Sequence, residues 1–279
     1  MTNEKLQALE EVLRPLCPGG IALAFSGGVD STLLLAVLSR IRREKPFPLL
    51  ALTACSDLLG EEEAPAAAAL AARYGVLHEI LRCKVLEIPE VRNNDPLRCY
   101  FCKKALFSAI FRRAGEEGLK SVLEGSHADD LKSYRPGRKA LRELGAVSPL
   151  LQAGLAKADI RVLARELALP VAEKPAAPCL ATRFDYGTLL TPEKLKQAGA
   201  GEAVLREFLP ANAPFRLRVH GDLARIEAEP GCFGKLLEAR ELVVQKLTGL
   251  GFRRVTLDLA GFRSGSFDDR FGEGGAGNV

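Results

Sequence analysis

Stretches that favour strands alternate with stretches that favour helices over the first part of the chain, and this alternation constrains the fold most. Short apolar runs typical of strands occupy residues 19–25, 47–54, 76–81 and 121–126. Segments with helical periodicity occupy residues 30–43, 61–75, 102–118 and 158–169. Strands that alternate with helices favour a parallel sheet covered by helices on both faces. We therefore predict an α/β domain.

After about residue 188 the pattern changes. It predicts a helix, a β-hairpin, a second helix and a last strand, at residues 191–209, 215–229, 232–251 and 254–259. This order predicts a smaller α+β domain, which we place at residues 188–266, after a first domain at residues 1–187. The tail at residues 267–279 is rich in Gly and polar residues, and we expect it to be disordered.

The segment LAFSGGVDST, residues 23–32, joins the first predicted strand to the first predicted helix. Gly27 and Gly28 allow a sharp turn and a close backbone approach to a ligand. Hydroxyl groups of Ser26, Ser31 and Thr32 add donors beside the N–H groups of the helix N-terminus, so the loop is suited to bind an anion. It matches neither G-x-x-x-x-G-K-[ST] nor G-x-G-x-x-G. Asp30 would repel a phosphate here unless Mg²⁺ lay between them or the carboxylate capped the backbone.

A second polar cluster, residues 124–141, follows the fourth predicted strand. Glu124, Asp129 and Asp130 supply oxygens of the kind that Mg²⁺ prefers. The cluster also has cationic side chains suited to phosphate or carboxylate, namely Arg135, Arg138 and Lys139. Its place at the carboxyl end of a parallel strand favours a role beside the nucleotide. A solvated loop is the alternative, and His127 is expected only to line the pocket.

The chain has 7 cysteines and a net charge of +4. No segment resembles a signal peptide or a membrane span, so we expect a cytoplasmic protein in which disulfides do not form. The charge is too small to indicate a nucleic-acid partner. Cys99 and Cys102 form a C-x-x-C, which fits a redox pair, half of a metal site or two buried thiols. Cys179 lies in a Pro-rich segment four residues before Arg183. A helix start at Cys102 would lower its thiol pKa.

The loop SGGVDS, residues 26–31, resembles the PP-loop of the ATP pyrophosphatase superfamily. That resemblance implies ATP and Mg²⁺, attack at the α-phosphate, release of pyrophosphate and an adenylated substrate. The resemblance extends to the LarE family over about residues 5 to 267. The segments that carry it, besides the loop, are RCYFCKKALF, EGSHADDLKSYRPGRKAL, KPAAPCLATRFDYGTLLTPEKL, RVHGDLARIE and VTLDLAGFRSGS.

LarE proteins are ATP-dependent sulfurtransferases that make the nickel-pincer nucleotide cofactor of lactate racemase. The resemblance implies that a carboxylate of pyridinium-3,5-dicarboxylate mononucleotide is adenylated and its oxygen replaced by sulfur. In one branch the cysteine that matches Cys179 is consumed as the donor. In the other, three cysteines hold a 4Fe–4S cluster whose open iron carries sulfide. With Cys99, Cys102 and Cys179, this chain is similar to the second branch. A zinc site, a dithiol or persulfide relay and a consumed Cys179 remain alternatives.

The resemblance also implies roles for single residues. Cys179 and Asp30 are expected to be catalytic. The residues expected to bind ATP or substrate are Ser26, Gly27, Gly28, Asp30, Ser31, Thr32, Asp129, Arg135, Arg183, Arg218 and Arg263. Arg225 is expected to bind substrate phosphate or to help pack subunits. A sulfide donor and a homo-oligomer are implied as partners, without membrane or nucleic acid. Three rival functions remain: a tRNA thiolase, an ammonia-fed amide-forming enzyme, and a nucleotide sensor or sulfur carrier without catalysis.

Overall fold

The computed structural model describes residues 2–59, 63–131, 136–175, 178–211 and 213–263. It forms two compact units, and they are described separately. The first unit contains Met1–Val85 and Leu97–Ala176, and the second contains Leu86–Pro96 and Ala177–Val279. The domain boundaries predicted from the sequence remain predictions, and the predicted disordered tail lies outside the described residues. None of the described helices combines the length and the apolar character that a membrane span requires.

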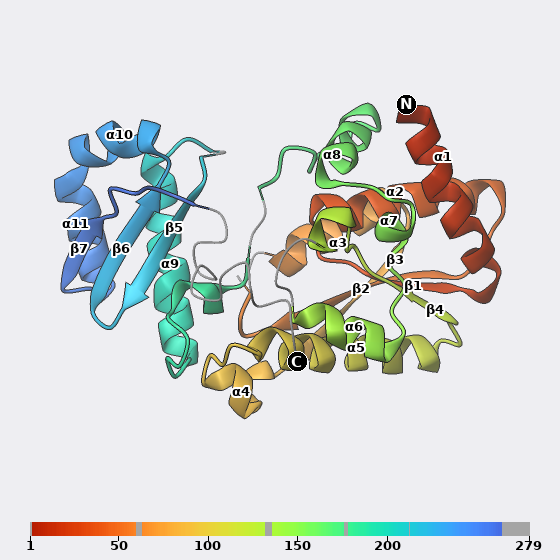
Figure 1. Cartoon of the computed structure of the whole chain (residues 1–279), viewed down its shortest axis with the longest axis horizontal. Helices are drawn as coiled ribbons and strands as arrows, with labels where there is room; N and C mark the ends of the chain where they lie inside the picture. The colour runs from red at the N-terminus through yellow and green to blue at the C-terminus, as the bar shows by residue number, and fades with distance from the viewer. Residues whose placement is uncertain (1, 60–62, 132–135, 176–177, 212, 264–279) are drawn as a thin grey trace. The chain divides into compact units, whose positions relative to one another are not determined.

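The first unit is built on a four-stranded parallel sheet (Figure 1). Its strands, in the spatial order β3-β2-β1-β4, are β3 Leu77–Cys83, β2 Leu49–Ser56, β1 Ile21–Ala24 and β4 Ser121–Leu123. The helices of this unit are α1 Thr2–Leu13, α2 Val29–Glu44, α3 Glu63–Arg73, α5 Arg98–Glu116, α6 Gly137–Leu144, α7 Pro149–Gln152 and α8 Lys157–Glu166. The predicted parallel α/β architecture is confirmed.

Helices cover both faces of this sheet because successive strand residues point to opposite sides and both sides are apolar. Leu23 and Ala51 join a core with α1, α2 and α8, whereas Ala22 and Leu52 join a second core with α5 and α6. Figure 1 shows α5 and α6 on one face and α1, α2 and α8 on the other. The carboxyl end of β1 therefore opens into the loop before α2, at one edge of the sheet.

The second unit contains a three-stranded sheet in the order β5-β6-β7. Strands β5 and β6 pair antiparallel, as predicted for the hairpin, and β7 pairs parallel to β6. Its elements are α4 Pro89–Arg92, α9 Pro192–Phe208, β5 Phe215–His220, β6 Leu223–Ala228, α10 Phe233–Glu238, α11 Arg240–Gly249 and β7 Arg254–Leu257. The single helix predicted over residues 232–251 is wrong, because Ala239 ends α10 and the chain starts again as α11.

The short segment 86–96 belongs to the second unit because Asn94 anchors it there. Asn94 is fully buried, and its side-chain amide donates to the carbonyl oxygens of Phe184 and Asp185 at 3.0 and 2.9 Å. Its backbone has φ 50°, in the left-handed region where Asn is tolerated better than most residues. The backbone carbonyl of Asn94 also accepts from the N–H of Gly187. This anchor fixes the chain immediately after Arg183, beside the segment that carries Cys179.

Candidate active site

The loop between β1 and α2 has the geometry of an anion cradle. Gly27 has φ +69°, and a Cβ atom at this position would lie 3.3 Å from the Cα of Ala67 in α3. Gly28 is the N-cap of α2, and no side chain caps the helix there. The Oγ atoms of Ser26 and Ser31 lie 3.2 Å apart, and Ser31 donates to the carbonyl of Gly28. The serines therefore hold the loop closed on itself, beside the N-terminus of α2.

Thr32 lies one residue further into α2 and is fully buried. Its hydroxyl oxygen has no hydrogen-bond partner among the described residues, although a buried hydroxyl normally has one. The backbone N–H of Thr32 is already engaged with the carbonyl of Gly28 at 2.9 Å. The hydroxyl of Thr32 is therefore a donor that a bound ligand can use.

Asp30, in the first turn of α2, pairs with a lysine that the sequence did not single out. The Nζ atom of Lys157 lies 2.7 Å from each carboxylate oxygen of Asp30. Both side chains are largely buried, at 31% and 25% exposed. Lys157 neutralises the carboxylate of Asp30. An acidic residue in the loop is therefore compatible with the binding of a phosphate. The Lys157 backbone N–H also donates to Oδ2 of Asp129 at 2.8 Å, which brings Asp129 to the same place.

The remaining residues of the second polar cluster have other partners. Glu124 is buried, and its carboxylate accepts from the backbone and the hydroxyl of Ser126 and from the hydroxyl of Ser148. Oδ2 of Asp130 accepts from the backbone N–H of His127 at 3.1 Å. Arg138 donates to the carbonyl of Asp130 at 3.2 Å, and Lys139 lies over the ring of Tyr100. Arg135 lies outside the described residues. Of the acids predicted to bind Mg²⁺, only Asp129 contacts Lys157.

Gly125 allows the loop and β4 to approach closely. A Cβ atom at Gly125 would lie 3.1 Å from the Cβ of Asp30 and 3.5 Å from the backbone nitrogen of Ser31. We expect Gly125→Ala to displace Asp30 by a few tenths of an ångström and to lower kcat/KM for ATP about tenfold, since small displacements at a preorganised site are costly. Pyrophosphate release measures the effect. Gly118→Ala is not a suitable control because its φ is positive, whereas Gly115→Ala meets no atom within 4 Å and should leave the rate unchanged.

Cys99 and Cys102 lie one turn apart at the start of α5. The helix begins at Arg98, so the prediction that it starts at Cys102 is wrong by four residues. Cys99 therefore lies in the first turn, where the helix dipole acts most strongly on a thiol, and Cys102 lies one turn later. Both cysteines are half-buried, and spacing of three residues places their side chains on one face of the helix. This arrangement fits two thiolate ligands of one metal centre.

Cys179 belongs to the second unit, directly before a 3₁₀ turn at Leu180–Arg183. Arg183 holds this turn. Its Nε and Nη2 atoms donate to the two carboxylate oxygens of Glu202 in α9, both at 2.8 Å. Its Nη1 atom donates to the carbonyl of Pro178 at 3.0 Å and lies 3.4 Å from the carbonyl of Cys179. The guanidinium is thus engaged by the protein on all sides, which favours positioning of Cys179 over ligand binding for Arg183.

A buried cluster of arginines on β5 lies next to this turn. Arg218 is 3% exposed, donates to Oε1 of Glu227 at 3.0 Å, and also donates to the carbonyl of Thr182. Arg216 is 8% exposed, and among the described residues it makes no hydrogen bond or ion pair, only a contact with the ring of Phe262. Burial, with Arg218 and Arg183 nearby, lowers the pKa of Arg216 to about 10. A buried guanidinium that makes no ion pair is stabilised when an anion binds to it.

The other two predicted arginines of this unit differ from Arg216. Arg225 donates to Oε1 of Glu227 at 2.9 Å and lies 3.6 Å from a carboxylate oxygen of Asp258, so acids already neutralise it. Arg263 is exposed and is the last described residue. Sequence reasoning named neither Arg216 nor Lys157. The alternation of Arg216 and Arg218 along β5, two cations on one face of a strand, was the available signal for the first.

The three cysteines predicted to bind iron fall in both units: Cys99 and Cys102 in the first, Cys179 in the second. Within the parts of the chain that the structure describes, no group of three or more His, Cys, Asp or Glu side chains is arranged to hold a metal ion. The 4Fe–4S cluster and the Mg²⁺ site therefore stay predictions.

Proteins with sequences similar to this chain support the interpretation of the loop and the parallel sheet as an ATP-binding domain. A family model described as asparagine synthase matches residues 18–209. Pyridinium-3,5-bisthiocarboxylic acid mononucleotide synthase of Lactiplantibacillus plantarum is 39% identical over 250 residues, 89% of each chain. An uncharacterised protein of Synechocystis is 36% identical over 96% of this chain and 98% of its own. A tRNA-cytidine(32) 2-sulfurtransferase of Cereibacter sphaeroides is 30% identical over 53% of this chain and 56% of its own. Because the Lactiplantibacillus relative is 39% identical over 89% of each chain and the family model matches more than half of this chain, the protein belongs to the LarE family of ATP-dependent sulfurtransferases, within the PP-loop superfamily.

Proposed function

We propose that this protein adenylates a carboxylate of pyridinium-3,5-dicarboxylate mononucleotide and converts it to a thiocarboxylate. In the first step a carboxylate oxygen attacks the α-phosphate of ATP, and pyrophosphate leaves. In the second step sulfur attacks the acyl carbon, and AMP leaves with the original oxygen. A second round on the other carboxylate gives the bis-thiocarboxylate for the nickel-pincer nucleotide. The proposal rests on the relative that makes this product and on the chemistry of this chain's own residues.

One observation supports this substrate most directly: Cys179 adjoins a buried arginine cluster in which the Arg216 guanidinium makes no hydrogen bond or ion pair with another described residue. The substrate carries a phosphate and two carboxylates, so Arg216 is suited to bind one of its anionic groups. Arg218 lies on the same face of β5 and is buried beside it. We assign substrate binding to Arg216 and Arg218, positioning of Cys179 to Arg183, and ATP binding to the loop with Ser26, Gly27, Gly28, Ser31 and Thr32. Mg²⁺ would supply charge neutralisation between the phosphates, with Asp129 as a candidate ligand, since Lys157 already bonds both carboxylate oxygens of Asp30.

The experiment that tests the proposal is product analysis by mass spectrometry and ³¹P NMR. The purified protein is incubated anaerobically with ATP, Mg²⁺, the dicarboxylate mononucleotide and sulfide. We expect AMP, pyrophosphate and a mono- or bis-thiocarboxylate in matching amounts. ADP and phosphate as products would contradict the adenylation step. ATP binding without pyrophosphate release would favour a sensor or carrier, and sulfur transfer to tRNA but not to the mononucleotide would favour a tRNA thiolase.

We propose that the sulfur is carried by a 4Fe–4S cluster held by Cys99, Cys102 and Cys179. Three thiolates leave one iron without a protein ligand, and sulfide from an external donor would bind there. Anaerobic reconstitution followed by iron and sulfide analysis tests this, and Cys99→Ala should lose both the brown colour and the iron. A colourless protein that binds zinc instead would contradict it. We further propose a cytoplasmic homo-oligomer, and sedimentation velocity measures the assembly.

Substitution of Arg216 distinguishes a role in binding the mononucleotide from a purely structural role. We expect Arg216→Met to raise KM for the mononucleotide ten- to thirtyfold, because a charge-assisted hydrogen bond to an anion is lost. The same change should raise the free energy of unfolding of the ligand-free protein by about 1 kcal/mol, because it removes a buried charge without an acidic partner. Urea denaturation and steady-state kinetics measure both effects.

Arg206→Met is a control for this change, since Arg206 also contacts a ring, that of Phe215, but lies in α9 and bonds carbonyl groups. It should leave KM unchanged. If Arg216→Met destabilises the protein and leaves KM unchanged, Arg216 is structural and the proposed substrate contact is wrong.

A further inference from the structure

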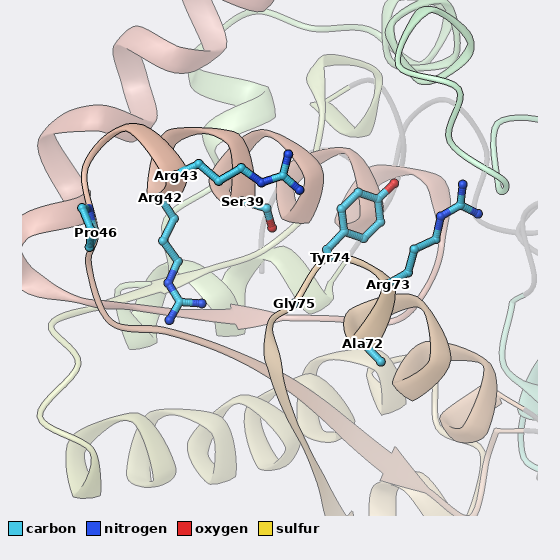
Figure 2. A pocket seen from close by; sticks show the side chains of 8 residues that line it. All are labelled: Ser39, Arg42, Arg43, Pro46, Ala72, Arg73, Tyr74 and Gly75. Atoms are coloured by element: carbon cyan, nitrogen blue, oxygen red, sulfur yellow. The ribbon is translucent and has the colours of Figure 1, made fainter.

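A cavity of about 590 Å³ lies in the first unit, away from the phosphate loop. It is lined by the end of α2, the end of α3 and the turns that follow them: Ser39, Arg42, Arg43, Pro46, Ala72, Arg73, Tyr74 and Gly75 (Figure 2). These segments lead into the amino ends of β2 and β3, whereas the phosphate loop follows the carboxyl end of β1. Helix α2 runs from the loop to the cavity over 16 residues, about 24 Å.

The cavity is lined by cations without protein partners. Arg42 is half-buried and Arg43 and Arg73 are exposed; none of the three makes an ion pair or hydrogen bond with another described residue, and no acid is among the residues that line the cavity. Glu44, next to Arg43 in sequence, pairs instead with Arg14 at 2.9 Å. In Figure 2 the side chain of Arg43 extends from α2 toward Tyr74, whereas Arg42 extends away from that ring and Arg73 extends beyond it. Three positive charges therefore border one space.

Arginines at helix C-termini interact favourably with the helix dipole, which explains why the residues at the ends of α2 and α3 are cationic. The dipole does not explain why a tyrosine lies beside them. The Tyr74 side chain is half-buried, its hydroxyl has no hydrogen-bond partner among the described residues, and burial raises its pKa, so it stays a neutral O–H donor. Three guanidinium groups and one phenol thus offer donors to a cavity whose lining supplies no charged acceptor.

A second cavity, of about 170 Å³, continues from the first. The two share Ser39, Arg43 and Tyr74. The second one adds Arg40, which pairs with Glu10, and an apolar lining from α2 and from the segment after α8, namely Ala36, Val37, Leu167 and Leu169. A ligand that filled both spaces would place an apolar ring against these side chains and an anionic group among the arginines. Ligand sites of this size combine an apolar lining with a few polar groups in this way.

We propose that this double cavity is a binding site for a small phosphorylated molecule that carries an apolar or aromatic group. It is separate from the ATP-binding loop and lies at the other end of α2. Arg43 binds the phosphate and Tyr74 donates a hydrogen bond to it, Arg42 and Arg73 add positive charge at the rim, and the apolar side chains of α2 with Leu167 and Leu169 contact the ring. The proposal does not depend on the reaction assigned to the other sites.

The test is ¹⁹F NMR of protein labelled with 3-fluorotyrosine, since the sequence has only 4 tyrosines. Tyr74→Phe assigns the Tyr74 resonance. We expect 1-naphthyl phosphate to shift this resonance at submillimolar concentration and to bind at least about tenfold tighter than inorganic phosphate, because only the first probe fills the apolar part. The weakest dissociation constant expected for such a site is on the order of 10 mM. If the Tyr74 resonance does not shift at up to about 10 mM 1-naphthyl phosphate, the proposal is overturned.

Two triple variants with the same loss of charge locate the site. R42A/R43A/R73A should weaken the binding of 1-naphthyl phosphate at least about tenfold. R112A/R142A/R165A removes three exposed arginines of the same unit that do not line the cavity, and it should bind like the wild type. Equal binding by the two triple variants would mean that the probe occupies another site, such as the phosphate loop, and would overturn the proposal.

Discussion

Replacement of Lys157 by methionine is expected to lower kcat/KM for ATP-dependent pyrophosphate release about 100-fold. Lys157 bonds both carboxylate oxygens of Asp30 at 2.7 Å, and both side chains are less than a third exposed. Without the lysine, Asp30 would keep a negative charge beside the site where phosphates bind. Loss of one preorganised electrostatic group at a reacting centre costs about 2.7 kcal/mol of transition-state stabilisation at the lower end of the usual range, which corresponds to about 100-fold in rate.

Two variants control for general damage to α8. Lys5→Met removes another lysine that bridges to this helix, where it pairs with Asp159 and holds the pKa of that carboxyl below its usual range. It should cost little activity. The double variant Asp30→Asn with Lys157→Met removes both charges and should recover part of the pyrophosphate release lost in the single variant. A Lys157→Met protein with the wild-type rate would show that Asp30 needs no neutralising partner.

The sheet and the loop were predictable because their signals are contiguous. The residues from Ser26 to Ser31 stand in one run, and the strand before them is apolar on both faces, as a covered parallel strand must be. Lys157 was not predictable in this way. It lies 127 residues from Asp30, and its own surroundings, AKADIRV, have the pattern of an ordinary helix start. Only the fold brings the N-terminus of α8 to the N-terminus of α2.

Arg183 and Arg216 show a second limit of sequence reasoning. Arg183 was chosen because it lies four residues after Cys179, yet its guanidinium bonds Glu202, which comes 19 residues later. Arg216 was not predicted as a site residue, although it lies two residues before Arg218 in the same strand. The sequence shows two cations on one face of β5, but whether such an arginine binds a ligand or the protein depends on its burial and on the acids around it, which the fold determines.

Replacement of Cys179 by alanine is expected to reduce thiocarboxylate formation by a factor of at least about 1,000, to the detection limit, because its thiol is required whether it ligates the cluster or supplies the sulfur itself. Pyrophosphate release in the presence of the mononucleotide should continue, since the phosphate loop lies in the other unit and keeps all its residues. Both products are measured in the same reaction by mass spectrometry. Cys232→Ala is the matched control, a buried cysteine of the same unit, and it should keep the wild-type yield.

Comparison of Cys179→Ala with Cys99→Ala then identifies the sulfur carrier. If a cluster held by Cys99, Cys102 and Cys179 carries the sulfide, both variants lose sulfur transfer, and the wild-type protein makes many equivalents of product with an unchanged intact mass. If Cys179 itself is consumed, Cys99→Ala remains active for a single turnover, and the wild-type protein loses the mass of H₂S at residue 179 through conversion to dehydroalanine. Full activity of Cys179→Ala would exclude both routes, because the thiol common to them would then have no part in the reaction.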